Sequence, residues 1–289
     1  LMKEISNIKK KFFIKKLFVK ICRIFGYEII DQSTFSVPTQ NKLIGDNLSL
    51  PGEKSIVIPL GETKISRKVK ALTIIFRSCT NVNMLTQNKK RLFEKNKSEY
   101  TFRSLNSIIC SLNKAKKKFS KIEFNIIVVD YNSEKGDLDQ IKNQLNKSIF
   151  NHSIISLNMN DFKDKINKTN AKNEVVTDRQ MSNMANIYKS LLIARDECED
   201  LVYLVEDDYI HQQDSIIEMI FSYERIASQI NRELILCPAD YPYLYTKANP
   251  TNIFLGYKRH WRRVEETLCT FLTSKSIINA YWKKFTSMC

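Results

Sequence analysis

Short apolar runs alternate with longer amphipathic segments from residue 71 to the end of the chain. The apolar runs are rich in β-branched and aromatic residues and are bounded by polar or turn-forming residues, which is typical of buried strands. They are ALTIIFRS (71–78), KIEFNIIVVD (121–130), HSIISLN (152–158), LVYLV (201–205), ELILC (233–237) and TLCTFLTS (267–274). Because consecutive residues of these runs are apolar, the pattern predicts a sheet that is covered on both faces.

The segments between the strands show apolar residues at helical spacing. We predict helices over residues 84–119, 138–147 and 177–200, and a further helix after Asp214. Thr177 or Asp178 is the expected N-cap of the third helix, and Asp214 is the expected N-cap of the last. Strands that alternate with helices predict an α/β fold with a mostly parallel sheet flanked by helices, and we assign this domain to residues 71–289.

The first 70 residues have a different character. Residues 1–30 predict a basic amphipathic helix that ends at Gly26, and residues 31–70 predict an irregular lead-in with one short strand at SIVIPL. Two interpretations of the helix stay open: it docks on an anionic membrane surface, or it packs on the main domain with its lysines in water. The chain begins with Leu1 before Met2 and stops at Cys289 inside a predicted helix, so we expect a fragment truncated at its C-terminus.

Composition and charge limit the classes of partner. The formal net charge is +15, but no zinc-finger, basic-zipper or aromatic-interleaved RNA-binding pattern is present, so we expect no nucleic-acid partner. The seven cysteines are odd in number and none has CxxC spacing, which favours reduced thiols over disulfides or a zinc site. No apolar run reaches the roughly 18 residues of a membrane span. These features predict a cytoplasmic location, peripheral on the inner face of the membrane if the N-terminal helix docks there.

One strand runs directly into three acids. The stretch LVYLVEDDYIHQQDS carries Glu206, Asp207 and Asp208 immediately after its apolar residues, and Asp130 ends another strand. In an open α/β sheet, ligands bind beyond the carboxyl ends of the strands. Adjacent carboxylates repel one another, and hard oxygen ligands suit Mg²⁺ or Mn²⁺, which bridges substrate phosphates. The pattern therefore predicts a Mn or Mg site that holds a nucleoside diphosphate, unless the acids only cap the next helix or lie in water.

Several motifs occur in an order that is informative. LTIIFRSCTNVNML (72–85) has apolar residues before Arg-Ser, and EFNIIVVDYNSEKGD (123–137) closes in Asp and a Ser-containing loop. NMANIYKSLLIARDECEDLVYLVEDDYI (183–210) joins a helix with Ala-Asn to a strand that ends in Glu-Asp-Asp. In this order they resemble the GT-A-fold glycosyltransferases, in particular the family two-like nucleotide-sugar transferases, over about residues 71–289. The resemblance implies metal-dependent transfer of a sugar from a nucleoside-diphosphate donor to a glycan or lipid-linked acceptor.

The resemblance also implies roles for individual residues. The nucleotide-sugar would be bound by residues at the carboxyl edge of the sheet, namely Arg77, Ser78, Asp130, Arg179, Asn186 and Asp207. Glu206 and Asp208 take the two acid positions of the family's Asp-x-Asp motif and would hold the metal, with His260 as a third candidate ligand. The sequence departs from the family because Glu replaces the first Asp and no Arg precedes Asn186. Arg179 is the nearest replacement for that charge.

The segment 237–267 is rich in polar and aromatic residues. Aromatic faces and planar cations suit sugar rings and phosphates, so we expect this segment to form the acceptor side; alternatively it is a surface loop whose tyrosines pack on the core. An inverting transfer needs a general base for the acceptor hydroxyl, and the candidates are Asp240, Glu265 and Glu266.

Two other functions stay open. One is a nucleotidyltransferase, although no Gly-rich phosphate loop follows the first strand as in the common sugar-nucleotide version. The other is a non-catalytic basic protein on the same scaffold that binds membranes or nucleic acid.

Overall fold

The computed structural model describes residues 17–27, 64–81, 95–169, 173, 175–241, 244, 252–287 and 289. The chain divides into two compact units. The larger one, here called the sheet unit, comprises Thr63–Ala239, Gly256–Lys258 and Thr267–Cys289. The second unit comprises Leu1–Glu62, Asp240–Leu255 and Arg259–Glu266. Each unit is described by itself.

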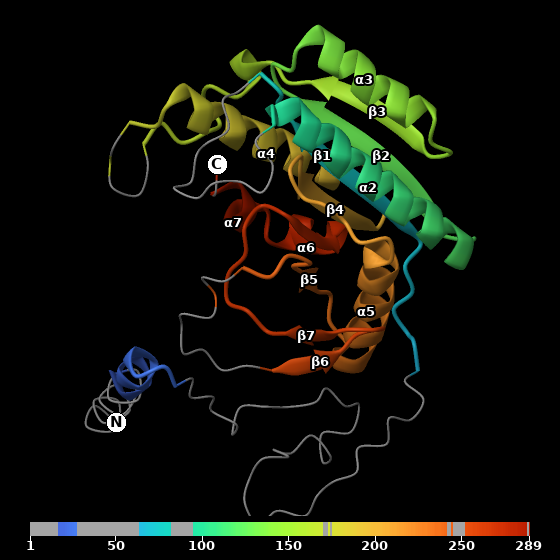
Figure 1. Ribbon diagram of the computed structural model, residues 1–289, viewed down its shortest axis with the longest axis vertical. Coiled ribbons are helices and arrows are strands. Elements are labelled where there is room, and N and C mark those ends of the chain that lie inside the picture. Colours follow the sequence, from blue (N-terminus) through green and yellow to red (C-terminus); the bar gives the residue numbers. More distant parts are fainter. Residues whose placement is uncertain are drawn as a thin grey trace, which may run out of the picture. The chain divides into compact units, whose positions relative to one another are not determined.

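The sheet unit is built around a six-stranded sheet with the order β3-β2-β1-β4-β8-β5 (Figure 1). The strands β1, β2, β3 and β4 are parallel to one another, whereas β8 is antiparallel to both β4 and β5. Their bounds are β1 Ala71–Ser78, β2 Glu123–Asp130, β3 Asn151–Ser156, β4 Leu201–Glu206, β5 Ile235–Leu236 and β8 Phe271–Ser274. The predicted α/β fold with a mostly parallel sheet flanked by helices is confirmed.

Two layers of helices cover the sheet. The helix α2 (Lys97–Lys118) contacts both α3 (Lys135–Asn146) and α5 (Ser215–Ile230) and forms one layer with them. The helix α4 (Asp178–Asp196) contacts α6 (Lys275–Ala280) and α7 (Trp282–Thr286) in the other layer. A short 3-10 helix, η2 (Met159–Asp161), follows β3.

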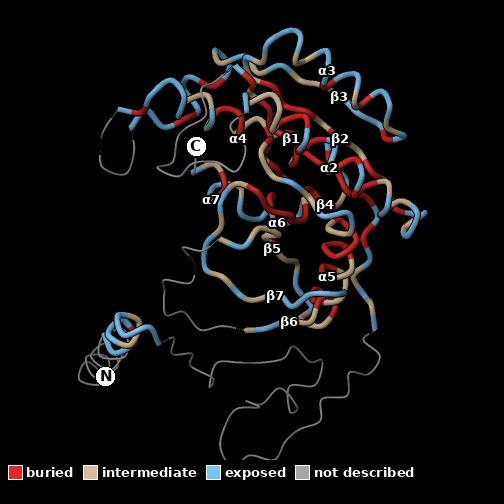
Figure 2. The backbone as a smooth tube through the Cα atoms, in the orientation of Figure 1, coloured by how far each residue is buried: buried red, intermediate tan, exposed pale blue. Residues whose placement is uncertain are grey.

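The core explains why the strands are apolar throughout. All eight residues of β1 are buried, and Figure 2 shows the central strands and the inner faces of the helices in red. Ile75, Val129 and Leu204 belong to the core cluster that also contains residues of α4, α6 and α7. Leu105 and Ile108 of α2 are completely buried. A side chain of this size contributes roughly 1.5–3 kcal/mol when it is fully buried, so the two-faced apolar pattern is what stabilises the sheet between its layers.

Several predicted boundaries are wrong. Of the helix predicted over 84–119, residues 84–94 lie outside the described residues, and α2 begins at Lys97 because Asn96 has extended backbone angles. The strand predicted over 233–237 is only Ile235–Leu236, because β5 is the edge strand of the sheet and pairs with β8 through two residues. Asp214 is the N-cap residue of α5, as predicted, but its side chain makes no capping hydrogen bond; its carboxylate lies 3.2 Å from Nζ of Lys258.

The second unit contains the part of the N-terminal helix that the structure describes. Residues 17–24 are helical, and Gly26 follows with a φ of 82°, so the helix ends in the left-handed glycine as predicted. Residues 1–16, residues 28–30 and the strand predicted at SIVIPL lie outside the described residues. None of the helices in the described ranges combines the length and the apolar character that crossing a membrane requires.

Candidate functional site

The candidate site lies at the carboxyl edge of the sheet, beside the point where the strand order reverses. The chain leaves β1 for β2 and β3 on one side and returns to β4 on the other, so β1 lies between β2 and β4. Open α/β sheets bind ligands beside such a point. The register places Arg77 opposite Glu206 and Ser78 opposite Asp130. The acids that the sequence singled out therefore meet at one edge, as expected.

Asp207 is the most enclosed of the three consecutive acids. Only 6% of its surface is exposed. One carboxylate oxygen lies 2.5 Å from Nζ of Lys97, and the other accepts hydrogen bonds from the Thr101 hydroxyl at 2.9 Å and the Cys79 amide at 3.2 Å. Removing one member of a buried ion pair typically costs about 3–5 kcal/mol, because the other charge is left without compensation. Asp207 therefore joins the loop after β4 to the start of α2, and its oxygens are already occupied by the chain.

Glu206 and Asp208 are more accessible than Asp207. Their side chains are 32% and 28% exposed. The Nη2 atom of Arg77 lies 3.0 Å from Oε1 of Glu206, an ion pair without the geometry of a hydrogen bond. The same guanidinium donates to the Asn183 side chain at 3.2 Å. Oδ2 of Asp208 lies 3.8 Å from Nζ of Lys97.

These contacts decide how well the acids fit a divalent cation. Carboxylate oxygens are suitable ligands for Mg²⁺ or Mn²⁺. However, the ammonium of Lys97 lies against both Asp207 and Asp208, where such an ion would have to bind. In the ranges that the structure describes, no three His, Cys, Asp or Glu side chains gather as a metal-binding group. The arrangement does not fit a divalent ion unless Lys97 moves away, so the metal role of Glu206 and Asp208 stays a prediction.

Asp130 organises the loops beyond β1 and β2. It is 3% exposed, and its carboxylate accepts hydrogen bonds from the hydroxyls of Ser78 at 2.6 Å and Ser133 at 2.5 Å. The two loops are also joined by hydrogen bonds between Thr80 and the segment that begins at Ser133. In this arrangement Asp130 holds the loops in place, while its predicted contact with a base or ribose is untested.

The thiol beside these acids is not set up as a nucleophile. Burial, followed by the negative charges of Asp207 and Asp130, raises the pKa of Cys79 to about 11. The thiolate is the reactive form of cysteine, so Cys79 stays protonated and inert near neutral pH. Covalent catalysis by this cysteine is therefore disfavoured.

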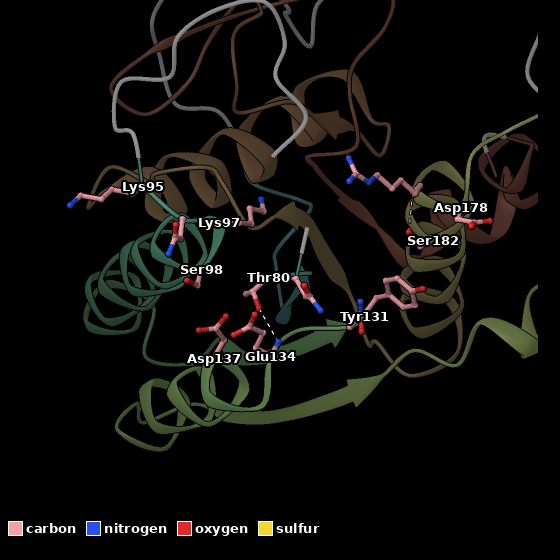
Figure 3. Close-up of a pocket in the computed structure, with 13 residues that line it drawn as sticks. Thr80, Lys95, Lys97, Ser98, Tyr131, Glu134, Asp137, Asp178 and Ser182 are labelled. Carbon is pink, nitrogen blue, oxygen red and sulfur yellow. Dashed lines mark hydrogen bonds between the residues drawn. The ribbon is translucent and has the colours of Figure 1, made fainter. Parts of the chain in front are cut away.

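A pocket of about 800 Å³ opens at the same edge (Figure 3). This volume lies within the range of small-molecule and cofactor sites. The pocket is bounded by the loops after β1 and β2 and by the first residues of α2, α3 and α4. Its lining is formed by Thr80, Asn81, Lys95, Asn96, Lys97, Ser98, Tyr131, Asn132, Glu134, Asp137, Asp178, Arg179 and Ser182. Three basic and three acidic side chains are among them, so the lining combines charge with many neutral donors and acceptors.

The two predicted site residues of α4 have different surroundings. Arg179 lines the pocket, as a residue beside a nucleotide should. Asn186 is 5% exposed, and its side-chain amide donates to the Val129 carbonyl at 3.1 Å. Asn186 therefore fastens α4 to β2 and is not part of the pocket lining.

The predicted general bases and the third metal ligand belong to the second unit. Asp240, Glu265, Glu266 and His260 all fall within it. His260 begins β7 (His260–Arg262), which pairs with β6 (Ile253–Leu255) in a two-stranded sheet. The carboxylate of Asp240 lies 3.5 Å from Nη2 of Arg262. The catalytic or ligand roles of these residues stay predictions.

Sequence reasoning missed Lys97 and Tyr131. Lys97 was hidden because the predicted helix began at residue 84, which made the lysine an ordinary position inside a helix. Tyr131 directly follows Asp130 at a strand end and could have been found from that position, because residues just after parallel strands lie at the ligand-binding edge.

Comparison with known proteins adds no relative: no protein-family model matches the chain, and no curated protein matches it.

Proposed function

We propose that the protein is a glycosyltransferase of the GT-A type that moves a sugar from a nucleoside-diphosphate donor to a hydroxyl group of a glycan or lipid-linked acceptor. The observation that carries the proposal is the juxtaposition of the acid cluster after β4 with the 800 Å³ pocket beside β1 and β2. Lys97 belongs to both, because it lines the pocket and pairs with Asp207. The strand order β3-β2-β1-β4 supports a nucleotide-binding role, since dinucleotide-binding folds share this order.

The pocket offers suitable groups for each part of such a donor. The ring of Tyr131 provides a face for a base, and the amides of Asn81 and Asn132 provide donors and acceptors for the base or ribose. Lys97 and Arg179 provide positive charge for the diphosphate. Preorganised cations stabilise charge that develops on a leaving group, so the same two side chains would favour departure of the nucleoside diphosphate.

The acceptor side of the proposal draws on the second unit. The helical segment 17–24 and the turn after it carry exposed apolar side chains, including Ile24 at 76% and Phe25 at 73% exposure. Lys20 and Arg23 lie on the same short helix. Apolar side chains beside basic ones favour binding at an anionic membrane surface, where lipid-linked acceptors lie. This supports a peripheral position on the cytoplasmic face of a membrane as part of the proposal.

A thermal-shift screen tests the proposed function. Nucleoside mono-, di- and triphosphates with the common bases, and inorganic pyrophosphate, are added to the full chain with EDTA or with Mn²⁺. A ligand at 100 times its dissociation constant stabilises the fold by about 2.7 kcal/mol, so a specific nucleoside diphosphate should raise Tm by several degrees. A response only to triphosphates would favour a nucleotidyltransferase. No response to any nucleotide would remove both enzymes and favour the non-catalytic alternative.

A further inference from the structure

The ammonium of Lys97 occupies the position at the acid cluster where a metal ion was expected. Nζ lies 2.5 Å from Oδ1 of Asp207 and 3.8 Å from Oδ2 of Asp208. The Lys97 side chain is only 12% exposed, although lysine is among the residues that are least often buried. Its charged end is therefore held by these carboxylates and does not extend into water.

The helix does not explain this placement. Lys97 is the first residue of α2, and the N-terminus of a helix carries partial positive charge that disfavours a cation. Asn96, the N-cap residue, makes no capping hydrogen bond from its side chain that would compensate. An acidic residue would stabilise the helix better at this position. The lysine is favourable here because Asp207 and Asp208 face it.

The formal charges of the cluster also indicate that Lys97 compensates the acids. Glu206, Asp207 and Asp208 together carry three negative charges, and Arg77 and Lys97 supply two positive ones through the ion pairs at 3.0, 2.5 and 3.8 Å. A divalent ion bound to the same oxygens would lie within a few ångströms of the ammonium, and like charges at that distance repel strongly away from bulk water. Lys97 and a divalent cation are therefore alternatives at this site.

We propose that Lys97 is the built-in counter-ion of the acid cluster and that it takes the place of a divalent cation in neutralising the diphosphate of the substrate. Lys97 faces both the carboxylates and the pocket, so one side chain would compensate the acids and contact an incoming phosphate. The part that concerns the diphosphate rests on the proposed function. The role of Lys97 as counter-ion of the acids does not depend on the proposed function.

Direct Mn²⁺ titration of the full chain tests the counter-ion role without any nucleotide. Wild type, Lys97→Met and Lys95→Met are compared by calorimetry and by Mn²⁺ electron paramagnetic resonance. Lys95 is the matched control, because it lines the same pocket, is exposed and points outward in Figure 3. Lys97→Met should bind Mn²⁺ at least about tenfold more tightly than wild type. This factor corresponds to only part of the repulsion energy between two like charges about 4 Å apart near a protein surface. Lys95→Met should behave as wild type does.

The opposite result overturns the proposal. The acids would form a metal site despite the lysine if two results were found together. Wild type and Lys97→Met would bind Mn²⁺ equally tightly, and Asp208→Asn would not bind it. Lys97→Met leaves Asp207 buried without a cation and can fail to fold. In that case the double variant Lys97→Met with Asp207→Asn restores the charge balance, and its Mn²⁺ affinity is compared with wild type: an increase supports the proposal, and equal affinity overturns it.

A second measurement addresses the diphosphate. Binding of the nucleoside diphosphate found in the thermal-shift screen should be unchanged by EDTA in wild type and at least about tenfold weaker in Lys97→Met, because a charge-assisted contact is lost. Loss of wild-type binding in EDTA would overturn this part. If no diphosphate binds in either buffer, the proposed function fails, whereas the Mn²⁺ titration still decides the counter-ion role.

Discussion

Lowering the pH from 7 to 5 is expected to destabilise the protein through His211, which anchors the segment after the acid cluster. The Tyr203 hydroxyl on β4 lies 2.8 Å from Nε2 of His211, and the His211 amide donates to the Ser107 hydroxyl at 2.9 Å. Burial raises the pKa of Tyr203, so this hydroxyl stays protonated and is able to donate to a neutral imidazole. Burial lowers the pKa of His211 to about 4, although a hydrogen bond with the Tyr209 backbone acts in the opposite direction.

The sign and size of the effect follow from this difference in pKa. An unfolded histidine has a pKa of about 6.5, so above that pH neither state is protonated and the full stability is present. Between pH 6.5 and 4 the unfolded chain takes up a proton that the folded protein refuses, and the free energy of unfolding decreases. The loss is about 2 kcal/mol at pH 5 and about 3 kcal/mol at pH 4.

Urea unfolding at pH 7 and pH 5 measures this loss. In His211→Gln the side chain can still accept from Tyr203 but does not titrate. Wild type should therefore lose about 2 kcal/mol more than His211→Gln between the two pH values. His152→Gln is the matched control, because His152 is an exposed histidine on β3, and it should follow wild type. An equal pH dependence for wild type and His211→Gln would show that protonation of His211 is not the source of the loss.

Two further predictions concern the loops and the N-terminus. Asp130→Ala removes the acceptor of the Ser78 and Ser133 hydroxyls, so it should lower the free energy of unfolding by at least about 2 kcal/mol and weaken nucleotide binding. Urea unfolding measures the loss of stability, which should be smaller in Ser78→Ala. Unchanged stability in Asp130→Ala would show that these hydrogen bonds contribute nothing. Deleting residues 1–30 should leave the nucleotide-induced Tm shift intact but reduce co-sedimentation with vesicles that contain anionic lipid. Equal vesicle binding with and without residues 1–30 would show that this segment does not bind the membrane.

Much of the sheet could be predicted from local patterns. The β-branched runs at 71–78 and 123–130 became β1 and β2, and Thr177 caps α4 through the capping box with Gln180. The meeting of Asp130 and Glu206 at one edge also followed, because the carboxyl ends of parallel strands lie together. These features depend on residues that are close in sequence, or on a rule of topology that needs only the order of the elements.

The partners of the acids could not be predicted in the same way. Lys97 and Asp207 are 110 positions apart, and their contact depends on where α2 begins and how it packs. The ion pair between Arg67 and Asp200 spans 133 positions and likewise depends on how distant segments pack. An acidic triplet indicates only that some cation is needed. Whether the chain supplies that cation itself depends on tertiary packing.

Calorimetric titration of a pocket-filling variant shows whether the pocket beside the acid cluster binds a nucleoside diphosphate, as the proposed function requires. Ser182→Trp places an indole in the lining from α4, at a residue whose hydroxyl donates to the Arg179 carbonyl of its own helix. Wild type should bind one nucleoside diphosphate per chain, and Ser182→Trp, with a Tm close to that of wild type, should bind it at least about tenfold more weakly. Equal affinity in the two proteins would show that the nucleotide binds elsewhere, and no diphosphate binding by wild type would rule out the proposed donor.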